Sequence, residues 1–119
     1  MKWIALPLAA ACLALPLAAH AQREIDLHAR NAGELAELCA ANPREPGGDA
    51  RINYCHGFTQ GVVDVELMHG KPFCFPNPAP TRTATLHQFV EWVHESADRR
   101  NANAVTGLMQ FLTERYPCH

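Results

Sequence analysis

Cysteine and histidine are the residues of this chain that could do covalent or metal chemistry. Cys55 and His56 are adjacent, and a thiolate beside an imidazole is the pairing of a cysteine nucleophile with its base. Neighbouring residues on a helix point about 100° apart, so this pair cannot hydrogen-bond as a catalytic dyad if the segment is helical. We therefore interpret Cys55 as half of a disulfide and expect no catalytic residue.

A second candidate, for metal binding, is formed by His87, Glu91 and His94, which recur at i, i+4 and i+7 and would share one face of a helix. Glu95 and Asp98 continue that polar face, so solvation explains the pattern without a metal. No H-E-x-x-H motif occurs. We expect no metal and no other cofactor, and keep these three residues as a weak alternative.

Residues 1–21 have the features of a cleaved secretory signal peptide. One positive charge, Lys2, precedes an apolar run that ends in the small-residue motif Ala19-His20-Ala21. Residues 22–119 then form a single 98-residue domain with nine Lys and Arg against twelve Asp and Glu, a net charge of −3. This small net charge gives no electrostatic reason to expect binding to nucleic acid or to a membrane surface. The predicted location is the periplasm.

The four cysteines that remain after cleavage are an even number in a small exported domain, which is typical of two disulfides. A zinc site is the competing interpretation, but the spacings contain no C-x2-C knuckle. The cysteines are Cys39, Cys55, Cys74 and Cys118.

Hydrophobic periodicity predicts an all-α, disulfide-stapled bundle of four, or four to five, helices with up-down topology. The first helix begins near Asn31 and ends before Pro43, and the second covers about residues 50–69 with Asp49 as its cap. Thr85 and Gln88 form a capping box for the third helix, and the fourth starts after Asn101 and stops at Pro117. The predicted inward-facing residues are Leu35, Leu38, Cys39, Ile52, Cys55, Phe58, Val62, Val65, Leu86, Phe89, Val90, Val93, Ala97, Val105, Leu108, Met109, Leu112 and Tyr116.

This topology selects the disulfide pairing. Cys39 and Cys55 flank the first loop at matching depth, while Cys74 and Cys118 lie at the opposite pole, where the second and fourth helices end. A bond from Cys39 to Cys74 would have to span the second helix, roughly 30 Å, whereas a disulfide requires Cα atoms about 4.4–6.8 Å apart. The predicted pairs are Cys39–Cys55 and Cys74–Cys118.

Two features of the sequence point to packing or binding. Gly57 and Gly61 cost roughly 1 kcal/mol each relative to alanine in a helix interior, so we expect them to allow close approach of another helix, from the bundle or from a second subunit.

The prolines of loop 71–80 restrict its backbone before any partner binds, which favours a role in recognition. Its phenylalanines could equally cover the core. The candidate partner-binding residues are Lys71, Phe73, Phe75, Asn77 and Arg82.

Three short motifs, Cys55-His-Gly-Phe-Thr-Gln-Gly61, Phe73-Cys-Phe-Pro76 and Tyr116-Pro-Cys118, together resemble the Rap/Tai family of immunity proteins. Leu38-Cys39 and the Thr85-x-x-Gln88 helix start extend the match over about residues 35–118. The residues that carry over from the family are structural ones: the four cysteines, Gly57, Phe58, Gly61 and Pro76.

The resemblance implies a small exported helical bundle, often a homodimer, that blocks a peptidoglycan amidase delivered by type VI secretion. We therefore predict a non-enzymatic periplasmic inhibitor whose partner is a cell-wall amidase. One alternative is a small acid-responsive chaperone, because six histidines after residue 21 could move the net charge from −3 to +3. The other is a metal-binding protein that uses the histidine cluster described above.

Overall fold

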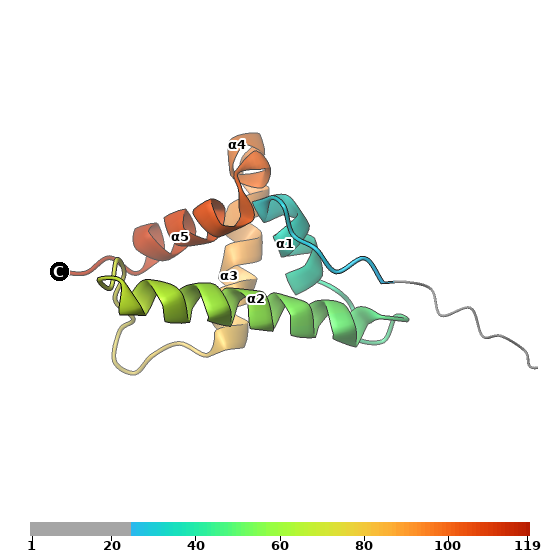
Figure 1. Ribbon diagram of the computed structural model, residues 1–119, viewed down its shortest axis with the longest axis horizontal. Coiled ribbons are helices and arrows are strands. Elements are labelled where there is room, and N and C mark those ends of the chain that lie inside the picture. The colour runs from blue at the N-terminus through green and yellow to red at the C-terminus, as the bar shows by residue number, and fades with distance from the viewer. Residues whose placement is uncertain (1–24) are drawn as a thin grey trace, which may run out of the picture.

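A computed structural model describes residues 25–119 as an all-α protein of five helices, which confirms the predicted fold class (Figure 1). The predicted signal peptide, residues 1–21, lies outside the described residues. Among residues 25–119 there is no strand, only an isolated antiparallel bridge between Asn31 and Asn103. The helices are α1 (Ala32–Cys39), α2 (Gly48–Met68), α3 (Arg82–His94), α4 (Ala97–Asn101) and α5 (Ala104–Arg115).

Helix α1 is short but central, since it packs against each of the other four helices. Its first turn is capped as predicted, with the Asn31 side chain accepting a hydrogen bond from the Glu34 amide at 2.8 Å. Ala32, Leu35 and Ala36 are fully buried. The small side chain of Ala32 lets the start of α5 approach α1 closely, because Gly107 of α5 lies against it.

Aromatic rings fill the space between α3 and α5. Phe89 and Phe111 pack edge to face with ring centroids 5.5 Å apart, and Trp92 lies 5.9 Å from Phe111. Tyr116 extends this cluster toward the C-terminus. Buried aromatic pairs contribute about 0.5–1.5 kcal/mol beyond the area they bury, so this cluster stabilises the packing of α3 against α5.

The start of α3 differs from its prediction. Thr81, not Thr85, is the N-cap, and its hydroxyl accepts a hydrogen bond from the Ala84 amide at 3.1 Å. Thr85 lies one turn inside the helix, where its hydroxyl donates to the Thr81 carbonyl. The helix can begin earlier because Arg82, Thr83 and Ala84 contain no helix-breaking residue and Pro80 ends the preceding loop.

The start of α2 also differs. Asp49 is exposed and does not cap the helix; Gly47 is the N-cap, with a left-handed φ of 77°, and the helix begins at Gly48. A Cβ on Gly48 would lie 1.8 Å from the Asn42 carbonyl oxygen. The Gly47-Gly48 pair therefore sets this turn, because both the backbone conformation and the contact require glycine.

Three residues predicted to face inward are exposed. Val65 lies beyond the last turn of α2 that rests on the core, and Val105 points to solvent while Ala104 and Phe111 are buried instead. Ala97 is exposed because α3 ends at His94 and Ser96 caps a separate short helix, α4, by accepting from the Arg99 amide.

Both disulfides are present with the predicted pairing. Cys39 and Cys55 join α1 to α2 with Cα atoms 5.1 Å apart, and Cys74 and Cys118 join the loop after α2 to the C-terminus with Cα atoms 4.9 Å apart. Helices α2 and α5 both end at the left side of Figure 1, and the second bond joins the loop after α2 to the segment after α5.

The glycines that allow close helix packing are not the predicted ones. Gly57 and Gly61 are exposed, and a Cβ built on either would meet no described atom within 4 Å. Gly107 in α5 is buried, and its Cβ would lie only 2.7 Å from the Cβ of Ala32. The prediction of close approach within the bundle was therefore wrong for Gly57 and Gly61, which lie on an open face of α2.

Candidate functional site

The segment between α2 and α3, residues 69–81, is a loop whose central part is attached to the C-terminal segment. Cys74 makes a disulfide with Cys118, and its amide donates a hydrogen bond to the Tyr116 carbonyl at 2.8 Å. Its prolines and this double attachment restrict the backbone on both sides. Most of the segment is exposed nevertheless, so it presents a restrained surface to solvent.

The two phenylalanines of the segment have opposite environments. Phe73 is 1% exposed and belongs to the main core, whereas Phe75 is 37% exposed. Phe75 rests on Phe73, with centroids 5.4 Å apart, and on Tyr116 at 5.0 Å. Phe73 therefore supports the segment from beneath, and Phe75 is the aromatic ring available to a partner.

The polar candidates Lys71, Asn77 and Arg82 are all exposed. Lys71 has a left-handed φ of 51°, and Asn77 precedes Pro78 through a cis peptide bond. Neither Lys71 nor Arg82 has a carboxylate within 4 Å among residues 25–119. Within the described residues, these two cations therefore have no acidic partner that would compete with a ligand.

Three exposed apolar residues, Val65, Leu67 and Met68, lie at the end of α2, where the segment begins. These side chains are 51%, 37% and 83% exposed. Leu67 and Phe75 line one hollow, and neighbouring exposed apolar residues mark interaction surfaces. Leu67 therefore extends the candidate site from the loop onto α2.

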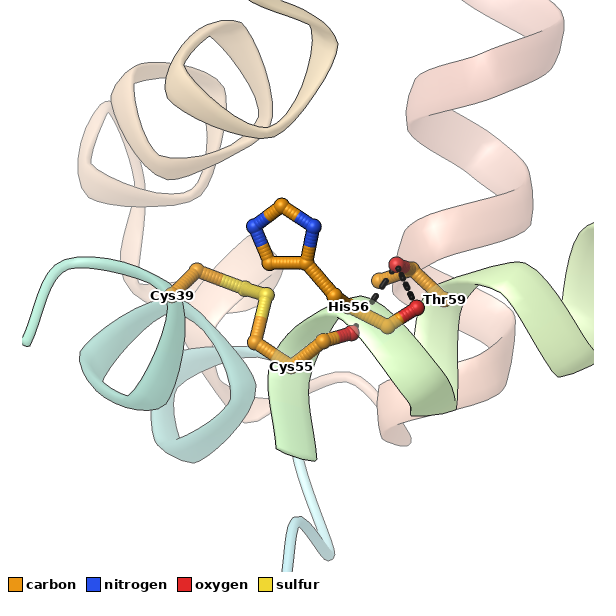
Figure 2. Close-up of a disulfide and its surroundings, with 4 residues drawn as sticks. All are labelled: Cys39, Cys55, His56 and Thr59. Carbon is orange, nitrogen blue, oxygen red and sulfur yellow. Dashed lines mark hydrogen bonds between the residues drawn. A yellow bond between two sulfur atoms is a disulfide. The ribbon is translucent and has the colours of Figure 1, made fainter. Parts of the chain in front are cut away.

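The Cys55-His56 pair cannot act as a nucleophile and base, because Cys55 is fully buried and bonded to Cys39. Figure 2 shows the imidazole of His56 beside this disulfide and Thr59 turned back toward the helix backbone. The Thr59 hydroxyl donates to the carbonyls of Cys55 and His56, at 2.9 and 3.2 Å. These contacts belong to the interior of α2 and carry no reactive group.

The three residues of the weak metal candidate do not assemble. His87 Nδ1 lies 3.6 Å from a Glu91 carboxylate oxygen, but within the described part of the chain no three His, Cys, Asp or Glu side chains are placed to hold an ion. Both partners of the pair are exposed, as expected for a solvated helix face.

Glu114 has a perturbed carboxyl that contacts Trp92 of the aromatic cluster. The Trp92 indole donates a hydrogen bond to Glu114 at 2.8 Å, which lowers the pKa of that carboxyl, and Gln110 and Arg99 add to the effect. The Arg99 guanidinium also stacks on the Trp92 ring at 4.3 Å. This network joins α3, α4 and α5 and stabilises the scaffold of the site.

Comparison with known families bears on the role of this scaffold. The family model for Rap1a immunity proteins matches residues 31–118, nearly all of the described chain. The chain belongs to the Rap1a immunity protein family. This confirms the resemblance inferred from the cysteine, glycine and proline motifs, and it identifies the chain as an immunity protein, a class that binds an effector protein.

No curated protein and no solved structure matches the chain. Among residues 25–119, no helix reaches the length and apolar character needed to cross a membrane. The disulfides fit the oxidising compartment in which immunity proteins of this family act.

Sequence reasoning placed the candidate segment but missed its extension onto α2. Leu67 and Met68 were assigned no role, and Val65 was expected in the core. A signal for Leu67 was present, because it lies four residues after Val63 and therefore on the same face of the helix.

Proposed function

We propose that this Rap1a family member is a periplasmic immunity protein that binds a peptidoglycan amidase effector of type VI secretion and occludes its active-site cleft. Residues 1–21 direct export as a cleaved signal peptide, and residues 22–119 are the working domain. Binding alone produces protection, since an occluded cleft admits no peptidoglycan. The inhibitor itself needs no catalytic residue.

The observation that carries this proposal is the restrained, exposed segment with Phe75 at its centre. A segment that is already ordered loses less conformational entropy on binding, and exposed aromatic rings are frequent anchors of protein interfaces. The disulfide to Cys118 and the hydrogen bond from the Cys74 amide hold the backbone in place. Family membership supplies the class of partner, an effector protein.

Within the segment, Phe75, Lys71, Asn77 and Arg82 are the proposed contacts, and Phe73 is the buried support beneath them. The exposed Arg and Lys side chains add directional ion pairs to the apolar anchor. A homodimer is compatible with this arrangement; sedimentation of the purified protein measures it.

Coexpression tests the proposal. A bacterium that produces a periplasm-directed amidase from the gene next to this one should lyse, and production of this protein should restore growth. A matched control lacks residues 1–21 and therefore stays in the cytoplasm, where it should not protect. The proposal fails if no neighbouring effector is neutralised and none binds the purified protein.

A further inference from the structure

A hollow of about 320 Å³ lies between the second half of α2, the segment 69–81, and helices α3 and α5. Helix α2 packs closely on α1 but has few contacts with α3 and α5. The floor of the hollow consists of buried core side chains, Leu86, Leu108 and Leu112. Its walls include Val63 and Leu67 of α2, so it is an apolar hollow that reaches the core.

Phe75 and Pro80 line both this hollow and a second one of about 560 Å³, which also contains Pro76, Tyr116 and Arg115. Phe75 therefore borders both hollows. A partner surface that fits here must place groups in both.

Each hollow contains one arginine that pairs with no acid. Arg82 lines the first and Arg115 the second, and neither has a carboxylate within 4 Å in the described chain. The Arg115 Nε donates to the Gln88 amide oxygen at 2.9 Å, which orients it without neutralising it. Asp64 also lines the first hollow, where it accepts a hydrogen bond from Gln60. Unpaired arginines on an acidic protein favour an acidic partner surface.

The surroundings decide which kind of occupant fits. A small ligand in the first hollow would not reach Arg115 in the second, whereas a protein surface can cover both hollows at once. A second copy related by a two-fold axis through this surface would bring its own Arg82 and Arg115 toward the same two arginines, and like charges in contact oppose association. A different, acidic protein satisfies both constraints.

We propose that the effector inserts one apolar side chain into the hollow between α2 and the segment, and that carboxylates beside it pair with Arg82 and Arg115. This inference rests on the proposed function and adds the chemistry of the partner: an apolar projection flanked by acidic residues that straddles Phe75.

The experiment measures affinity by calorimetry with a catalytically inactive form of the amidase identified by coexpression. Ala79→Trp fills the first hollow from an exposed loop position, so the core is left intact. Arg82→Glu and Arg115→Glu reverse the two charges. Each should weaken binding at least about tenfold. The matched controls Ala97→Trp and Arg44→Glu alter exposed residues that line neither hollow and should leave affinity unchanged.

A charge exchange gives an independent readout. Replacing one acidic residue at the effector's docking surface by lysine should restore much of the affinity lost in Arg82→Glu or Arg115→Glu.

If the wild-type protein protects and binds but all three variants bind as tightly as it does, the immunity function stands and this surface is not the docking site. If Ala79→Trp dissociates a homodimer without weakening effector binding, a second copy occupies the hollow and the inference is overturned. If no amidase is neutralised, the proposed function fails first, and this inference falls with it.

Discussion

Alanine at Gly57 and Gly61 should stabilise this protein, whereas alanine at Gly107 should destabilise it. All three glycines lie inside helices, so each replacement removes the same conformational disadvantage of glycine, roughly 1 kcal/mol. The difference lies in what the new methyl group meets. At Gly57 and Gly61 it meets no described atom within 4 Å, and we expect a gain of about 1 kcal/mol each.

At Gly107 the methyl group would lie 2.7 Å from the Cβ of Ala32 and 3.6 Å from that of Ala102. The first distance is far below van der Waals contact, and neither neighbour is a flexible side chain that could move aside. Overpacking of this kind costs about 1–3 kcal/mol. It should outweigh the gain in helix propensity, so the free energy of unfolding should fall.

Urea unfolding of residues 22–119, followed by tryptophan fluorescence, measures these changes. Trp92 is the only tryptophan after Trp3, and it lies in the core between α3 and α5. A loss of stability in Gly57→Ala or Gly61→Ala at low protein concentration would contradict the conclusion that this face of α2 is uncovered. Equal effects at Gly107 and Gly57 would refute the close contact between α1 and α5.

Three further predictions concern the disulfide, a perturbed carboxyl and a helix cap. The double variant Cys74→Ser/Cys118→Ser opens a 44-residue link and should lower the free energy of unfolding by about 4 kcal/mol, measured by urea unfolding under oxidising conditions; an unchanged midpoint would contradict the account. Because Trp92 lowers the pKa of Glu114 below its ordinary value of 4.5, that carboxylate contributes stability above the unfolded pKa, and the contribution is lost as pH falls through the folded pKa. Glu114→Gln should therefore flatten the decline of melting temperature in acid, and an unaltered slope would show that the hydrogen bond is not coupled to folding. Thr81→Ala should cost about 1 kcal/mol through loss of the α3 cap, whereas a midpoint equal to wild type would place the cap elsewhere.

The helical fold could be predicted because apolar residues recur at helical spacing and the chain offers strong stop signals. Pairing of the cysteines followed from the same topology, since helix length separates the two poles. Helix starts were less predictable. Thr81 and Thr85 both offer a hydroxyl, and only the position of Pro80 and the packing of Thr85 against the core separate a cap from an interior residue.

The role of each glycine could not be predicted, because spacing does not reveal which helix face meets a neighbour. Gly57 and Gly61 share a face that no described residue covers, whereas Gly107 lies where α5 crosses Ala32. The same uncertainty applied to Phe73 and Phe75. They are two residues apart in an irregular segment, and only the three-dimensional structure shows which one is buried.

The affinity of a Phe75→Ala variant for the neutralised amidase tests the central claim most directly. Loss of an aromatic anchor typically costs 2 kcal/mol or more, so the dissociation constant should rise at least about thirtyfold. The far-ultraviolet circular dichroism spectrum should stay that of wild type, because Phe75 lies outside the helices and is partly exposed. A folded Phe75→Ala protein that binds and protects as well as wild type would show that the effector docks elsewhere.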